Sequence, residues 1–151
     1  MGNIIDTIGN TPLVEITSFH SNRKVKIFAK MEGNNPAGSV KDRAALNMIR
    51  SALERGEISS SSKLIEATSG NTGIALAMIA SMYNLSLELV MPSSSTRERT
   101  LTMEAFGAKV TLLESMEICR DYAEEKAARE GYYILNQFAN PDNYLAHYKT
   151  T

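Results

Sequence analysis

What the chain lacks excludes several classes of protein. It has one cysteine, Cys119, and no tryptophan, so an internal disulfide framework and a cysteine-based zinc cluster are both excluded. Cys119 shares one face of a predicted helix with apolar neighbours, and we expect it to pack as a small hydrophobe rather than act as a nucleophile. The two histidines, His20 and His147, are far apart in the sequence, and without a cysteine partner they give little basis for a metal site.

Neither charge nor hydropathy indicates a nucleic acid or a membrane as partner. The formal net charge is -1, from 16 basic and 17 acidic residues, and no basic block stands out. The first residues have no basic segment followed by an apolar run, so no secretory signal is predicted. The longest apolar stretch, 74–80, is too short to span a bilayer. We therefore expect a cytoplasmic protein without metal, nucleic acid or membrane.

Strand and helix patterns alternate along the chain. After a helical turn at 4–8, we expect strands at 13–16, 25–31, 63–67, 85–91, 108–113 and 132–135, and helices at 40–55, 74–83, 95–106 and 116–130. Ser95 and Glu98 have the S-x-x-E spacing of a capping box at the start of the third helix. From residue 63 onward, strands and helices alternate strictly, which predicts an α/β fold with a parallel sheet covered by helices.

A lysine at the start of the first helix is the first candidate functional residue. Lys41 follows a loop rich in asparagine and glycine, and a protonated lysine is disfavoured at the positive end of a helix. A lysine held near neutrality is a nucleophile for carbonyl compounds such as pyridoxal phosphate. The alternative is structural: Ser39 and Asp42 form a capping arrangement, and Lys41 points into water.

A second loop, residues 68–73, has the sequence T-S-G-N-T-G and precedes an apolar helix. Glycines allow close approach of the backbone, hydroxyl groups add donors, and the helix dipole favours an anion, so the loop suits a carboxylate or a phosphate. The alternative is a tight turn in which Asn71 or Thr72 is only an N-cap. No P-loop, G-x-G-x-x-G or G-x-S-x-G pattern is present.

Together, the two loops resemble those of a known family. N-N-P-A-G-S-V-K-D-R at 34–43, followed by I-E-A-T-S-G-N-T-G at 65–73, is similar to the cysteine synthase (O-acetylserine sulfhydrylase) family, above all to its B type. The similarity extends from Ile8 to Thr151. It implies the tryptophan-synthase β-like α/β fold (fold type II) and pyridoxal 5'-phosphate as cofactor.

The resemblance also implies a role for individual residues. Lys41 matches the lysine that holds the cofactor covalently and later moves the α-proton of the substrate. Asn71 matches the amide that binds the ring hydroxyl of the cofactor. The residues that match the donors to the substrate carboxylate are Thr68, Ser69, Gly70, Thr72 and Gln137.

The implied reaction is a β-replacement. Acetate leaves O-acetyl-L-serine, and sulfide, or thiosulfate in the B type, adds to give L-cysteine or S-sulfocysteine. A homodimer and a regulatory serine acetyltransferase are the partners that the resemblance suggests. Two alternatives stay open: a relative of cystathionine β-synthase or of the serine and threonine dehydratases, and a small-domain fragment without catalysis of its own.

The resembling enzymes are about twice as long, and this chain matches only their N-terminal half. We therefore expect 1–35 to supply strands of a larger domain, 36–140 to form a small mobile domain, and 141–151 to begin the return to the larger one. On this interpretation the chain is truncated and inactive alone, because the cup for the cofactor phosphate belongs to the other half. The strands at 13–16 and 25–31 would then expose edges that invite self-association.

Overall fold

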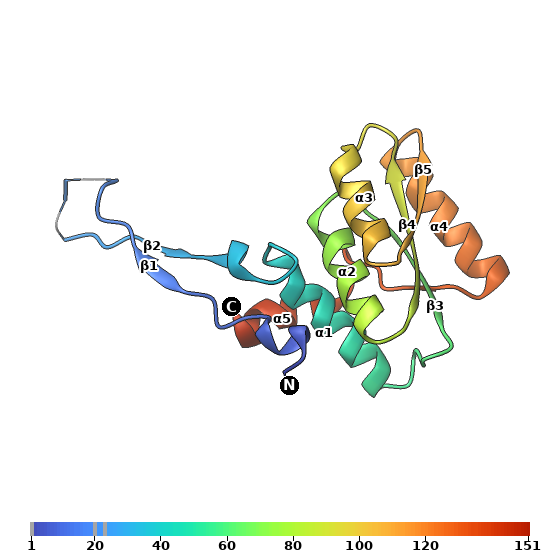
Figure 1. The fold of residues 1–151 in the computed structure, drawn as a ribbon, viewed down its shortest axis with the longest axis horizontal. Helices are drawn as coiled ribbons and strands as arrows, with labels where there is room; N and C mark the ends of the chain where they lie inside the picture. The colour runs from blue at the N-terminus through green and yellow to red at the C-terminus, as the bar shows by residue number, and fades with distance from the viewer. Residues whose placement is uncertain (1, 20, 23) are drawn as a thin grey trace.

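The computed structural model describes residues 2–19, 21–22 and 24–151 and has two parts (Figure 1). The larger part is a four-stranded parallel sheet with helices on both faces, and the smaller is a two-stranded antiparallel ribbon that projects from it. The predicted α/β class with a parallel sheet is confirmed. His20 lies outside the described residues.

The sheet has the strand order β5-β4-β3-β6, and all of its pairs are parallel. Its strands are β3 (Lys63–Ala67), β4 (Ser86–Pro92), β5 (Lys109–Leu113) and β6 (Tyr133–Ile134). β4 lies in the interior of the sheet and is buried from Leu87 to Met91, as expected for a strand covered on both faces. Because the strands are parallel, their carboxyl ends share one edge, where α/β proteins usually bind ligands.

Two apolar layers attach the helices to the sheet. Three helices cover one face: α1 (Lys41–Glu54), α2 (Asn71–Met82) and α3 (Arg97–Ala105). Their core includes Leu64 and Leu89, whereas Ile65 and Val90 belong to the core of the other face, beneath α4 (Met116–Glu130). Adjacent residues thus enter different layers, as the pleat of a strand requires. Cys119 is fully buried in the layer under α4, which confirms its predicted packing role.

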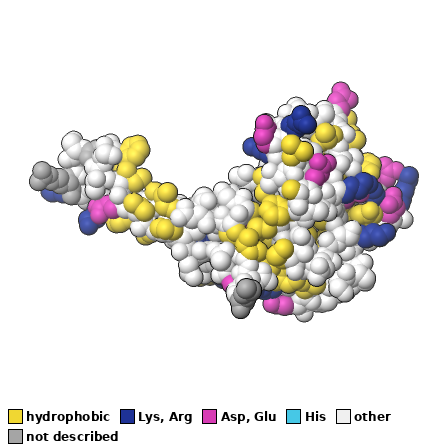
Figure 2. Space-filling model, viewed as in Figure 1, with side chains coloured by type: hydrophobic (Ala, Val, Ile, Leu, Met, Phe, Trp, Pro, Cys, Tyr) yellow, Lys and Arg dark blue, Asp and Glu magenta, His cyan; other side chains and the backbone are white. Residues whose placement is uncertain are grey.

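The ribbon consists of β1 (Leu13–Glu15) and β2 (Phe28–Lys30), which follow a 3-10 turn, η1 (Ile4–Thr7). β2 is shorter than the strand expected at 25–31, because its partner β1 is only three residues long. A second 3-10 turn, η2 (Glu32–Asn34), joins the ribbon to α1. Hydrophobic side chains run along the ribbon in Figure 2, and Leu13 is 63% exposed.

A helix that the sequence analysis missed ends the chain. α5 (Pro141–Thr150) packs on α1, where Asn47 Nδ2 donates to Asp142 O at 2.8 Å and Arg55 pairs with the Asp142 carboxylate at 2.8 Å. Asn140 caps it by accepting from the Asp142 N–H. An asparagine followed by proline is a helix-start signal, so this helix was predictable.

Two predicted helix starts were wrong. α2 begins at Asn71 rather than at residue 74, and its N-cap is Gly70, not Asn71 or Thr72. Apolar periodicity does not detect a polar first turn, which explains the late start. α3 begins at Arg97 with Thr96 as N-cap and no side-chain capping bond, because the N–H of Ser95 instead donates to Pro92 O in the turn after β4. The predicted Ser95–Glu98 capping box is therefore absent.

None of the helices in the described ranges combines the length and the apolar character needed to cross a bilayer. The same residues contain no group of three or more histidine, cysteine, aspartate or glutamate side chains that could hold a metal ion.

Candidate active site

Lys41 is the first residue of α1, and its side chain is half-buried. The N-cap of α1 is Val40, and no side chain caps the helix start. Ser39 Oγ accepts from the Lys41 N–H at 3.1 Å rather than from Asp42, whose carboxylate accepts from the Ala37 N–H at 2.6 Å. Burial raises the pKa of Asp42. Within the described residues, Lys41 Nζ has no hydrogen bond or ion pair. The predicted capping arrangement, with Ser39 as N-cap, is therefore wrong, and among those residues the amine of Lys41 has no partner.

A buried ion pair fixes the first turn of α1. Arg43 is 3% exposed and donates through Nε and Nη2 to the two carboxylate oxygens of Glu32, both at 2.8 Å. It also donates to Thr11 Oγ1 at 3.1 Å and to the carbonyl of Thr150. The hydrogen bonds from Arg43 lower the pKa of Glu32 to about 2. Residues from the N-terminal segment, η2 and α5 thus converge next to Lys41.

The second predicted site, at the start of α2, offers free backbone donors. Gly70 is the N-cap and supplies no side chain. In the part of the chain that the structure describes, no acceptor is recorded for the backbone N–H groups from Ser69 to Thr72. Thr68 and Thr72 are buried, whereas Ser69 and Asn71 are exposed. Free N–H groups at the positive end of a helix form an anion-binding site.

Gly73, in the first turn of α2, is packed closely by the side chains of Thr68 and Met103. A Cβ atom at this position would lie 2.7 Å from both Thr68 Cγ2 and Met103 Cε. Such distances are below van der Waals contact, so an added Cβ would force the side chains of Thr68 and Met103 to shift. This glycine serves close packing and not a special backbone angle.

Gln137 lies beside the loop after β3, as expected for residues at the ends of neighbouring strands. Its Nε2 donates to the carbonyl of Ala67 at 3.3 Å, directly before Thr68. Its backbone carbonyl accepts from Asn143 Nδ2 of α5 at 2.7 Å. Gln137 and the loop from Thr68 to Thr72, far apart in the sequence, are therefore neighbours in the structure.

His147 is a residue near Lys41 that the sequence analysis did not select. Burial, and then the positive charges of Lys41 and Arg43, lower the pKa of His147. Its Nδ1 lies 3.1 Å from Thr151 Oγ1. No sequence pattern points to His147, because its position next to Lys41 depends on how α5 packs against α1.

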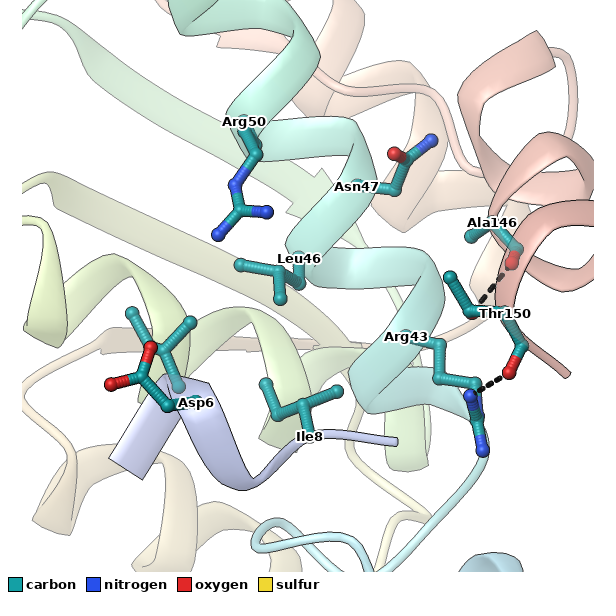
Figure 3. A pocket seen from close by; sticks show the side chains of 9 residues that line it. Asp6, Ile8, Arg43, Leu46, Asn47, Arg50, Ala146 and Thr150 are labelled. Carbon is teal, nitrogen blue, oxygen red and sulfur yellow. Dashed lines mark hydrogen bonds between the residues drawn. The ribbon is translucent and has the colours of Figure 1, made fainter. Parts of the chain in front are cut away.

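Two cavities lie close to these elements. The one drawn in Figure 3 measures about 340 Å³ and opens between η1, α1 and α5. Its walls combine apolar and polar side chains: Ile5, Asp6, Ile8, Arg43, Leu46, Asn47, Arg50, Ala146 and Thr150. A second cavity of about 230 Å³ touches Glu66, Ala67 and Asn136 at the carboxyl ends of β3 and β6. Lys41 lines neither of them.

The fold and the candidate site define a class: an α/β protein with an unpaired lysine at the start of one helix and free backbone N–H groups, from Ser69 to Thr72, at the start of another. We call this stretch from Ser69 to Thr72 the cradle. The model of a family described as "Pyridoxal-phosphate dependent enzyme" matches residues 4–151. The chain belongs to this family, and the predicted family relationship is confirmed.

Several relatives of the chain are named cysteine synthases. The chain is 51% identical to cysteine synthase B of Escherichia coli over 154 residues, which cover all of this chain and 51% of that protein. It is 49% identical to a cysteine synthase B sequence of Pseudomonas syringae, covering 98% of this chain and 89% of that one. A solved structure, a hydrogen sulfide-producing enzyme from Fusobacterium nucleatum, superposes with a TM-score of 0.91 at 45% identity, over 99% of this chain and 50% of that one.

The chain thus spans about half the length of the Escherichia coli relative and of the Fusobacterium structure. The residues present fit part of the family's cofactor. A primary amine without a partner, such as Lys41 Nζ, suits the aldehyde of pyridoxal phosphate. The free N–H groups at the start of α2 suit an anionic group.

Proposed function

We propose that this chain is the cofactor-lysine segment of a cysteine synthase, an enzyme that replaces the acetate of O-acetyl-L-serine by sulfide or thiosulfate. The observation that supports this most is the pairing of an unpartnered Lys41 with free N–H donors from Ser69 to Thr72. The cysteine synthase names of the relatives support the same reaction.

Lys41 is proposed to hold the cofactor and to move the α-proton of the substrate. When bound, pyridoxal phosphate supplies an electron sink for the negative charge left at the α-carbon. The half-buried position of Lys41 keeps its amine close to the protein interior, and the Arg43–Glu32 pair holds the backbone that carries it. Asn71, exposed in the first turn of α2, is proposed to bind the ring hydroxyl of the cofactor.

The loop after β3 is proposed to bind the substrate carboxylate. Thr68, Ser69, Gly70 and Thr72 provide hydroxyl and N–H donors, and the dipole of α2 favours the negative charge. The side-chain amide of Gln137 lies beside this loop, because it donates to the carbonyl of Ala67, and we propose that it also donates to the substrate carboxylate. Fixing the carboxylate orients the α-carbon, which is the contribution that positioning makes to catalysis.

The two parts of the fold support the expected domain division. We propose that residues 1–35 join a larger domain, that 36–140 form the small mobile domain, and that 141–151 lead back to the larger one. The ribbon projects from the sheet with Leu13 63% and Phe28 50% exposed, and such exposed apolar side chains favour a further partner surface. A homodimer, and serine acetyltransferase as a partner, belong to the same proposal.

Cofactor attachment and turnover test this function. Protein containing this chain should bind pyridoxal 5'-phosphate with visible absorbance and form cysteine from O-acetyl-L-serine and sulfide. Lys41→Ala should abolish both. Lys63→Ala is the matched control, because this exposed lysine begins β3, at the opposite end from the cradle, and it should change neither.

The outcomes separate the competing hypotheses. Absorbance that survives Lys41→Ala would refute the assignment of the lysine. Release of ammonia from serine or threonine without incorporation of sulfide would favour the dehydratase alternative. For the 151-residue chain alone, we expect weak cofactor uptake that washes out, and tight stoichiometric uptake would argue against the need for further residues.

A further inference from the structure

Glu66 is a buried carboxylate that the proposed mechanism does not use. It is the fourth residue of β3, two positions before Thr68, and only 3% exposed. Its Oε2 accepts from the Asn136 N–H at 2.9 Å and its Oε1 from the Gln137 N–H at 3.1 Å. Across the described residues, no lysine, arginine or histidine pairs with it.

The backbone around residue 136 is shaped to meet this carboxylate. Asn136 has a left-handed conformation, with φ of 53°, and such a residue lets successive N–H groups point to the same side and bind an anion. Asn143 of α5 donates through Nδ2 to the backbone carbonyl of the next residue, Gln137. The Gln137 side chain then reaches the carbonyl of Ala67.

A carboxylate is needed at this position because two donors face it. Burial raises the pKa of Glu66, and the backbone N–H groups oppose this effect. Hydrogen bonds to a carboxylate are stronger than those between neutral groups. A glutamine would present an amide nitrogen to one of the two N–H groups, so one bond would be replaced by a contact between donors.

We propose that Glu66 is a positioning residue for substrate binding: it holds Gln137 beside the loop from Thr68 to Thr72, so that both segments form one carboxylate-binding surface. The inference rests on the proposed function, in which that loop and Gln137 share the substrate carboxylate. Glu66 itself touches no substrate. It acts through the backbone of residues 136 and 137.

A purely structural role is the competing explanation. β6 is only two residues long, and Glu66 extends its attachment to β3 beyond the Ile65–Ile134 pair. In that case a substitution would lower the stability of the fold without a specific effect on the substrate. The two explanations differ in which kinetic constant changes.

Glu66→Gln is the main variant, and Glu88→Gln is its matched control. Glu88 is also a buried carboxylate, 2% exposed, on the adjacent strand β4, but its partners are Lys109, Lys126 and Thr111. Both substitutions replace a buried carboxyl group on neighbouring strands, but only Glu66 contacts residues 136 and 137. Glu66→Asp, which keeps the carboxylate, serves if Glu66→Gln does not fold.

The experiment uses protein containing this chain, loaded with pyridoxal 5'-phosphate, and O-acetyl-L-serine as the probe. Glu66→Gln should raise the KM for O-acetyl-L-serine about tenfold. A displaced Gln137 would lose its proposed hydrogen bond to the substrate carboxylate, and one hydrogen bond to a charged group corresponds to a change of about that size. The kcat and the cofactor absorbance without substrate should stay within about twofold of wild type. Glu88→Gln should leave this KM unchanged, and Glu66→Asp should raise it by a smaller factor.

A double-mutant cycle and amide exchange complete the test. If Glu66 acts through Gln137, then Glu66→Gln adds little to the KM of a Gln137→Ala protein, and it accelerates hydrogen exchange at the amides of residues 136 and 137. Full additivity, equal KM effects of Glu66→Gln and Glu88→Gln, or unchanged exchange would overturn the inference alone. A wild-type protein that does not process O-acetyl-L-serine would overturn the proposed function and the inference with it.

Discussion

Replacing Glu32 by glutamine tests whether the buried ion pair beside Lys41 stabilises the fold. Arg43 is almost inaccessible to solvent and donates two hydrogen bonds to Glu32 at 2.8 Å. Removing one partner of a buried pair leaves an uncompensated charge and costs about 3 to 5 kcal/mol. We therefore expect Glu32→Gln to lower the free energy of unfolding at pH 7 by that amount.

The pH dependence of stability gives a second, independent value for what the ion pair contributes to the free energy of unfolding. The pKa of Glu32 is lowered from its ordinary value of 4.5 to about 2. A lowered pKa contributes stability above the unfolded value, here about 3 kcal/mol at pH 7, and this stability is lost as the pH falls from 4.5 toward 2. Between pH 6 and pH 3, the difference between wild type and Glu32→Gln should therefore shrink by about 2 kcal/mol.

Urea unfolding followed by circular dichroism at several pH values measures both quantities. Glu57→Gln is the control, because Glu57 also accepts two hydrogen bonds from an arginine, Arg55, but in an exposed pair. Exposed pairs stabilise little, since water and salt screen them, and this variant should stay close to wild type. A constant gap between wild type and Glu32→Gln from pH 6 to pH 3, or equal effects of the two substitutions, would refute the reasoning.

Three further predictions concern packing and backbone conformation. Gly73→Ala should lower the free energy of unfolding by about 1 to 3 kcal/mol, the usual cost of overpacking, because its Cβ would collide with the side chains of Thr68 and Met103. A variant as stable as wild type would show that these side chains move aside without cost. Gly131→Ala should cost about 1 kcal/mol, because Gly131 ends α4 with φ of 70°, whereas Gly33→Ala, in open space, should be neutral. Cys119 should resist thiol reagents until the protein is unfolded in urea, since it is fully buried and burial raises the pKa of its thiol; rapid labelling of the native protein would show that α4 opens.

The strands of the sheet were predictable because their signals are local. Apolar runs bounded by turn residues place β3 at its observed residues and β4 and β5 within one residue of theirs. The helix at 116–130 matches α4 at both ends, because Ser115 is a favourable cap and Gly131 a favourable terminator. The bounds of such elements can be predicted without knowing what they pack against.

The sequence alone indicates the residues of the proposed site but not their contacts. The loop motifs lead to the proposal of Lys41 and the loop from Thr68 to Thr72, yet no local rule predicts that Glu32 pairs with Arg43 or that Glu66 holds the backbone of Gln137. These contacts join residues 11 and 71 positions apart in the sequence. His147 depends in the same way on the packing of α5.

Both helices that carry the proposed site begin without a side-chain cap. The N-caps of α1 and α2 are Val40 and Gly70, and neither makes a side-chain capping bond. α3 also lacks such a bond, whereas α4 and α5 are capped by the side chains of Ser115 and Asn140. A serine or asparagine at position 70 would bind an N–H group that the proposed function needs for an anion. Functional positions often break local rules at the expense of stability. The glycine N-cap of α2 is therefore consistent with the proposed binding of an anion, and the unpartnered amine of Lys41 is consistent with the proposed attachment of the cofactor.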